Sequence, residues 1–216
     1  MQLHPEGRLR AAGSIGHLQH DYTPTRWNAV AMTMKHRGPR PKVAPAGFGQ
    51  LLRDHYRPGE FGQSGWFRDP ELLAGLGPAL ADLVAGENPE LVIAPQSRGT
   101  LLGSLVATQL RIGLIELRKE VTRNSDGDSW LTAHTPPDYR DRNLELGVPA
   151  GLIPSGARVL FVDDWIDTGG QLFAAHAITT LARAHWCGAA VIIDGLTDPR
   201  LRRDFAIRSL LRRREL

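Results

Sequence analysis

The sequence of 216 residues predicts an α/β protein, in which helices flank a central parallel sheet. Short apolar runs at residues 91–94 and 159–162, each followed by a helical pattern, are the first observation. Runs of this kind are typical of strands that are buried on both faces of a parallel sheet. The second observation is that glycine and polar residues follow both runs, as in the ligand-binding loops at the carboxyl ends of parallel strands.

The elements of this fold can be placed in order along the chain. Asp69 and Pro70 predict the N-cap and first turn of a helix, because leucines then recur at helical spacing as far as Leu83. Further helices are expected at residues 99–110 and 172–185. Strands are expected at residues 91–94, 114–117, 143–148, 159–162, 189–194 and 206–211.

The first 65 residues differ from the rest. They have weak periodicity and several turn pairs, such as Gly38-Pro39 and Pro58-Gly59, and only residues 50–56 suggest a helix. We therefore expect residues 1–65 to form an irregular N-terminal arm or hood and residues 66–216 to form one core domain. The length suits one domain with a sizeable core.

The loop after residues 159–162 is the strongest functional signal. Two acids, Asp163 and Asp164, come where we expect the strand to end, and the loop closes on Gly169 and Gly170 before a helix. Carboxylates can accept hydrogen bonds from two vicinal hydroxyls, while loop amides and a helix N-terminus attract an anion. The string predicts a site for a phosphorylated sugar. A βα turn whose acids only cap the helix is the alternative.

Residues 159–170 resemble the phosphoribosyl-pyrophosphate signature of the type I phosphoribosyltransferases, which implies that family's fold with a small N-terminal hood. By this resemblance Asp163 and Asp164 bind the ribose 2′- and 3′-hydroxyls and Mg²⁺. The 5′-phosphate would lie in the loop of Asp167, Thr168, Gly169 and Gly170. The sequence departs from the pattern at Trp165, where a smaller aliphatic residue is usual, and at Gln171, where Thr is common.

Two further strand ends add positive charge. Ser97 and Gly99 allow close backbone approach at a helix N-terminus, and Arg98 adds a fork of donors. Residues 91–103 resemble the pyrophosphate loop of adenine phosphoribosyltransferases, which implies pyrophosphate contacts for these three residues. Arg118 and Lys119 end the next strand, as in the adenine enzymes. With Arg98 they would neutralise the leaving pyrophosphate, and the three are our candidate catalytic residues. An N-cap and a solvated charge pair are the alternatives.

The residues that bind the base are less clearly marked. Residues 65–69 resemble a Phe-Arg-Asp segment that holds adenine, so Phe67 and Arg68, together with Trp165, are the candidate base-binding residues. A buried aromatic pair beside an N-cap is an equally good interpretation. Residues 118–140 form a long polar stretch without the segment typical of adenine enzymes, which leaves the base open. We expect residues 120–138 to act as a lid that brings Arg123, Trp130 or His134 over the site.

Charge and cysteine usage restrict the other functions. The formal net charge is +3, and Lys occurs only at positions 35, 42 and 119. Without a basic stripe interleaved with aromatics, we expect no nucleic-acid partner and interpret Arg212-Arg213-Arg214 as a solvated tail. The single Cys187 excludes an internal disulfide and is interpreted as a packed thiol at the end of a helix. With no apolar run that could span a bilayer, we expect a cytoplasmic protein.

These observations lead to one main functional hypothesis and two others. We expect transfer of a 5-phosphoribosyl group from phosphoribosyl pyrophosphate to a purine-like base, with adenine as the first choice, Mg²⁺ as the cofactor and a homodimer as the assembly. A non-catalytic regulator that senses the donor is the alternative from another class. A transferase for a different base is the third.

Overall fold

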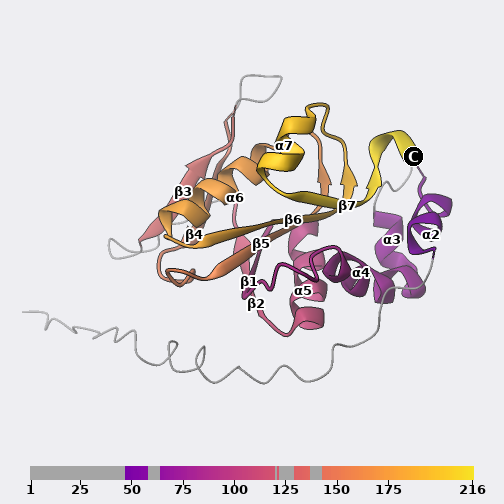
Figure 1. Ribbon diagram of the computed structural model, residues 1–216, viewed down its shortest axis with the longest axis horizontal. Coiled ribbons are helices and arrows are strands. Elements are labelled where there is room, and N and C mark those ends of the chain that lie inside the picture. Colours follow the sequence, from indigo (N-terminus) through magenta and orange to yellow (C-terminus); the bar gives the residue numbers. More distant parts are fainter. Residues whose placement is uncertain (1–46, 58–63, 120, 122–128, 137–142) are drawn as a thin grey trace, which may run out of the picture. The chain divides into compact units, whose positions relative to one another are not determined.

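The computed structural model describes residues 47–57, 64–119, 121, 129–136 and 143–216 (Figure 1). All of them belong to one compact unit, Pro39–Leu216. The greater part of the expected N-terminal arm, residues 1–46, lies outside the described residues, so the boundary at residue 65 stays a prediction.

The centre of the fold is a five-stranded sheet in the order β2-β1-β5-β6-β7, with every neighbouring pair parallel. This confirms the predicted fold class. The strands are β1 (Leu91–Pro95), β2 (Gly113–Leu117), β5 (Arg158–Ile166), β6 (His185–Asp194) and β7 (Ile207–Arg212).

Helices cover both faces of the sheet (Figure 1). Alternate residues of β5 explain this, because Leu160 and Val162 belong to the core cluster formed with α4 (Pro70–Asp82) and α5 (Arg98–Leu110), while Val159 and Phe161 face α6 (Gly170–Leu181). All four side chains are fully buried. A strand with apolar residues on both sides can only be stable between two helical layers, as its sequence predicted.

The described part of the N-terminal region packs on the core. The helix expected at residues 50–56 is present as α2 (Phe48–Asp54), which begins and ends two residues earlier. Helix α3 (Ser64–Arg68) was not predicted. Trp66 in α3 is fully buried, and its indole Nε1 donates to the Leu52 carbonyl at 3.1 Å. The predicted N-cap of α4 is confirmed, because the Asp69 carboxylate accepts from the amides of Glu71 and Leu72, each at 2.9 Å.

We had expected residues 118–140 to form one long polar loop, and this was wrong. Residues Trp130–His134 form strand β3, which pairs antiparallel with β4 (Glu145–Pro149) in a separate two-stranded sheet beside α6 (Figure 1). The strand expected at 143–148 is therefore present, but outside the parallel sheet. The weak alternation of β3, which mixes polar with apolar residues, hid it in the sequence. Of the lid expected at residues 120–138, residues 120, 122–128, 137 and 138, including Arg123, lie outside the described residues.

Several element ends also differ from the prediction. The helix expected to reach residue 185 ends at Leu181, because Arg183 has a positive φ of 55° and the Ala184 amide turns back to the Thr179 carbonyl at 3.0 Å. Cys187 therefore lies in β6 and not at a helix end, although its thiol is buried as expected. The short helix α7 (Pro199–Asp204), capped by Asp198, was not predicted.

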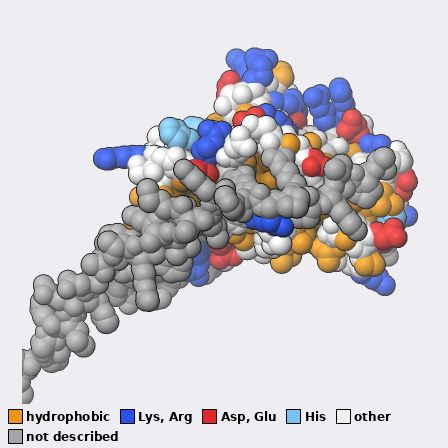
Figure 2. Space-filling model, turned by 60° about the horizontal axis from the view of Figure 1, so that its bottom comes forward, with side chains coloured by type: hydrophobic (Ala, Val, Ile, Leu, Met, Phe, Trp, Pro, Cys, Tyr) orange, Lys and Arg blue, Asp and Glu red, His pale blue; other side chains and the backbone are white. Residues whose placement is uncertain are grey.

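The chain ends in a short 3₁₀ helix, η1 (Arg213–Glu215), directly after β7. The arginines interpreted as a solvated tail are thus part of folded structure. On the face shown in Figure 2, Lys and Arg side chains form separate groups with acidic and apolar side chains between them. Among the described residues, no helix is long and apolar enough to cross a membrane.

Candidate functional site

A cavity of about 520 Å³ opens beyond the carboxyl end of β5. This is the switch point of the sheet, because β1 leads into α5 on one face while β5 leads into α6 on the other. The diverging loops leave a crevice between the two strands, which is where ligands bind in open α/β sheets. The cavity is lined by Lys119, Thr135, Pro136, Asn143, Leu144, Phe161, Asp163, Trp165, Ile166, Asp167, Thr168, Gly169, Gly170, Gln171 and Leu172.

We had expected the acid pair to come at the end of the strand, but it lies within β5. Pairing of β5 with β1 ends at Phe161, whereas pairing with β6 continues through Asp163 to Ile166. The strand is therefore held on one side only where the acids occur, and its other edge faces the crevice. Asp163 and Asp164 retain only 4% and 6% of their surface exposed.

Two charged neighbours and burial determine the ionisation of Asp163. Burial, and after it the adjacent Asp164 carboxylate, raise the pKa of Asp163 well above its ordinary range. The Asp164 amide donates to Asp163 Oδ1 at 2.9 Å and opposes this rise, as does the charge of Lys119. A hydroxyl donor or a cation placed beside Asp163 would favour its ionised form.

Replacing Asp163 alone by Asn is expected to stabilise the protein at neutral pH. The pKa of Asp163 is raised in the folded state, so the stability that this group contributes is fully present below its unfolded pKa and is lost as pH rises through its folded pKa. The amide does not titrate and can still accept from the Asp164 amide. We expect the free energy of unfolding, measured in urea from about pH 4 to about pH 8, to be higher for the variant than for the wild type, by a gap that widens with pH. A gap that stays constant or narrows with rising pH would contradict a raised pKa.

The pyrophosphate-loop candidates face the acid pair from the other strand. Arg98, the first residue of α5, forms an ion pair with the Asp164 carboxylate through its Nε. Ser97 precedes it without a side-chain capping bond, and the Gln96–Ser97 peptide bond is cis. A Cβ on Gly99 would lie 2.9 Å from Asp163 Oδ1, so only glycine lets α5 start this close to the acids.

The expected phosphate loop leads directly into α6. Gly169 has a φ of 82° and is the N-cap of this 12-residue helix, without a side-chain cap. Uncapped amides at a helix start are free to donate to an anion. The Gly170 amide reaches Thr168 Oγ1 only at 3.4 Å, and Gln171 Oε1 is buried without a hydrogen-bond partner among the described residues. Both residues lie on the cavity wall, where the uncapped amides can donate to an anion and the Gln171 oxygen can accept from a hydroxyl.

The two cations at the end of β2 are separated by the structure. Lys119 lies on the cavity wall, and its amide donates to Gln96 Oε1 at 3.2 Å. The Arg118 guanidinium instead lies over the Trp130 ring, 5.6 Å from its centroid, and is not on the wall. Lys119 is therefore brought to the candidate site, whereas Arg118 packs on the β3–β4 sheet.

The candidate base-binding residues are also divided. Trp165 is on the cavity wall, but Phe67 packs against the core cluster of α4 and α5, and Arg68 is exposed at the end of α3. The roles of Phe67 and Arg68 stay predictions.

Sequence reasoning missed two contributions to the site. The β3–β4 sheet was not predicted, and the segments next to its strands line the cavity with Thr135, Pro136, Asn143 and Leu144. Arg213 is the other, because its Nη1 donates to Asp167 Oδ1 at 3.0 Å and its guanidinium lies 5.9 Å from the centre of the Trp165 ring. Residues 46 positions apart carry no local signal of such a contact.

Comparison with known proteins agrees with this geometry. The family model described as "Phosphoribosyl transferase domain" matches residues 68–211. An adenine phosphoribosyltransferase of Saccharopolyspora erythraea is 36% identical over 135 residues, which are 59% of this chain and 70% of the relative. One from Sphingopyxis alaskensis is 30% identical over 168 residues, 72% of this chain and 83% of the relative. For that of Mycobacterium tuberculosis, 32% identical over 130 residues, the chain spans only 58% of the relative's length.

Solved structures have the same fold. An adenine phosphoribosyltransferase from Rhodothermus marinus superposes with a TM-score of 0.65 at 25% identity, over 78% of this chain and 99% of that one. The enzyme from Thermoanaerobacter pseudethanolicus gives a TM-score of 0.66 at 21% identity, over 76% and 99%. With the acid pair, the glycine loop and Arg98 gathered at the switch point of a parallel sheet, this chain belongs to the phosphoribosyl transferase domain family.

Proposed function

We propose that the protein transfers a 5-phosphoribosyl group from phosphoribosyl pyrophosphate to a ring nitrogen of adenine, and that it releases pyrophosphate. The observation that carries this proposal is the buried acid pair, which faces Arg98 on one side and the uncapped N-terminus of α6 on the other. The relatives described above are named as adenine phosphoribosyltransferases and none of them as a regulator, so the enzyme is favoured over the donor-sensing alternative.

The donor would contact the acid pair, the loop before α6 and the two cations as follows. Asp163 and Asp164 accept the ribose hydroxyls, and the amides and hydroxyl of the loop from Asp167 to Gly170 bind the 5′-phosphate. Arg98 and Lys119 lie on the side of the crevice formed by β1 and β2, where the pyrophosphate would lie. The base nitrogen forms a bond to ribose C1′ and loses its proton, which the departing pyrophosphate can take up, while the bond from C1′ to the pyrophosphate oxygen breaks with its electron pair leaving on the pyrophosphate.

In this scheme Arg98 binds one partner before the donor arrives and another afterwards. In the structure it pairs with Asp164, which is the carboxylate proposed to accept a ribose hydroxyl. Binding of the donor would replace this ion pair with two other interactions, a hydrogen bond from a ribose hydroxyl to Asp164 and an ion pair between the pyrophosphate and the Arg98 fork. The ion pair thus keeps both buried or half-buried charges compensated until the donor arrives, so that neither charge is left alone.

The acid pair also fits the expected Mg²⁺. In proteins this ion is bound by one or two carboxylates together with phosphate oxygens of a substrate. Among the described residues, no group of three or more His, Cys, Asp or Glu could hold a metal ion by itself, so donor oxygens would have to complete the coordination. Asp163 and Asp164 would hold the ion, which would supply charge neutralisation for the pyrophosphate. The homodimer stays a prediction.

A panel of bases tests the function and its alternatives in one assay. Pyrophosphate release is measured with the donor, Mg²⁺ and each of several purine and pyrimidine bases. We expect release with adenine and little with the others. Donor binding without release for any base would favour the regulator, whereas release with another base only would support the third hypothesis and overturn adenine.

A further inference from the structure

The three consecutive arginines at the chain end border a second cavity, of about 460 Å³. It lies between the segment that follows β6 and the turn from β7 into η1. Its lining residues are Asp194, Gly195, Leu196, Thr197, Arg202, Arg212, Arg213 and Arg214. None of them belongs to the lining of the first cavity.

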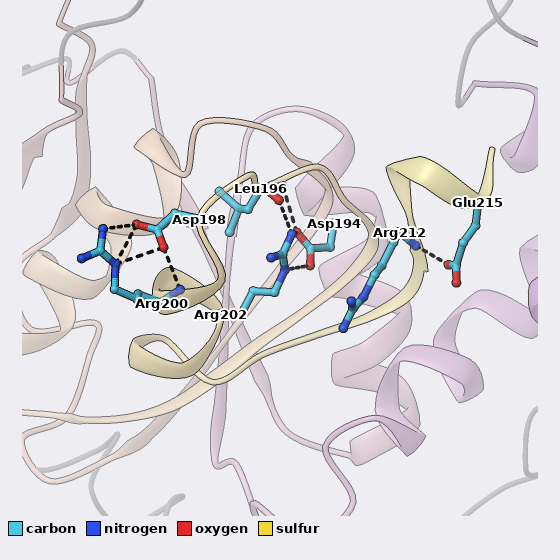
Figure 3. Close-up of polar contacts among 7 residues, drawn as sticks. All are labelled: Asp194, Leu196, Asp198, Arg200, Arg202, Arg212 and Glu215. Atoms are coloured by element: carbon cyan, nitrogen blue, oxygen red, sulfur yellow. Dashed lines mark hydrogen bonds and ion pairs between the residues drawn. The ribbon is translucent and has the colours of Figure 1, made fainter.

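Buried polar contacts hold one wall of this cavity in place (Figure 3). Asp194 is 3% exposed, and its carboxylate pairs with the Arg202 guanidinium, which also donates to the Leu196 carbonyl. The Leu196 amide donates back to Asp194 Oδ1 at 2.9 Å. Asp194 is in register with Arg212 on the next strand, so the wall and the arginines are attached to neighbouring strand ends.

The other wall carries positive charge, which the Glu215 carboxylate, an acceptor from the Arg212 amide at 2.6 Å, offsets only in part. Arg202 is paired with Asp194 and Arg213 with Asp167, but neither Arg212 nor Arg214 forms a side-chain ion pair with a described residue. The lining holds four arginines and one aspartate, so its charged side chains are mainly positive.

We infer that this arginine pocket binds a phosphorylated small molecule, with Arg212, Arg213 and Arg214 as the groups that hold the phosphate. Guanidinium forks match phosphate oxygens in pairs, and four arginines line this cavity. The volume of about 460 Å³ is within the range of small-ligand sites. The lining contains no aromatic side chain on which nucleic-acid bases could stack, which argues against a single-stranded nucleic acid.

Arg213 connects this pocket to the first cavity. Its guanidinium donates to Asp167 of the proposed 5′-phosphate loop and lies over Trp165. A phosphate in the arginine pocket would compete with Asp167 for Arg213. Asp167 would then keep an uncompensated negative charge beside the donor phosphate. This consequence rests on the proposed function, and it predicts that the ligand raises the KM for the donor without changing kcat.

Inorganic tripolyphosphate is a suitable probe, titrated by calorimetry into the full chain without donor or base. The test variant replaces Arg212 and Arg214 by Gln. The control replaces Arg53 and Arg203, two arginines on helices outside the pocket, and removes the same charge. We expect the test variant to bind the pocket site about tenfold or more weakly than wild type, since each lost charge-assisted hydrogen bond contributes a factor of this order. The control should bind like wild type.

Equal affinity in the test and control variants would overturn the inference, because net charge alone would then account for binding. A single-stranded oligonucleotide that displaces tripolyphosphate from the wild type but not from the test variant would also overturn a small-ligand pocket. The single variant Arg214→Gln, at the exposed chain end, provides the same comparison if the double variant does not fold. Because the titration needs no turnover, it is independent of whether adenine is the true acceptor.

Discussion

Replacing Asp163 and Asp164 together by Asn is expected to abolish phosphoribosyl transfer while the protein still folds. Both side chains are buried at the crevice, and Asn keeps their size but removes both negative charges. The ribose hydroxyls would lose anionic acceptors and Mg²⁺ would lose its protein ligands. Removing preorganised charge of this kind costs about a thousandfold or more in kcat/KM.

The assay is pyrophosphate release at saturating donor and adenine, with circular dichroism to check the fold. A matched control replaces Asp54 and Asp204, two acids on α2 and α7 that are not on the cavity wall. We expect the control to keep wild-type turnover. Activity in the Asp163 and Asp164 double variant within tenfold of the control would refute the role of the acid pair.

Replacing Arg98 by Ala is the change with the next largest expected effect. The variant removes the fork proposed to receive the pyrophosphate, and it also leaves Asp164 buried without its ion-pair partner. We expect kcat to fall by about a hundredfold to a thousandfold, the usual cost of removing one donor that stabilises charge in the transition state. The unfolding midpoint in urea should fall too, because a buried carboxylate loses its compensation.

Arg98→Lys separates the two effects. Lys keeps the positive charge beside Asp164 but not the planar fork. Stability close to wild type together with a kcat near that of Arg98→Ala would show that the geometry of the fork matters for the pyrophosphate. If Lys restores full turnover, Arg98 acts only as a charge, and if Ala retains full turnover, Arg98 has no part in the reaction.

Much of the fold followed from local pattern. A parallel sheet with a ligand site at its carboxyl edge was predicted from the apolar runs at β1 and β5 and the glycines after them. The parallel sheet is observed, and a cavity opens at its carboxyl edge. Patterns of this kind are reliable because a strand buried on two faces has almost no room for polar residues. The cap at Asp69 followed in the same way from Asp-Pro before recurrent leucines.

The sequence by itself therefore determined the fold class and placed the candidate site residues at the carboxyl ends of β1 and β5, because short-range chemistry dictates both. Tertiary structure alone decided three other features. Pairing with β6 extends β5 past the acids, and pairing with β4 makes Trp130–His134 a strand. The third feature is the hydrogen bond that Arg213 donates to Asp167. Each depends on partners far away in the chain, and no local pattern can encode which distant group will satisfy a strand edge or a charge.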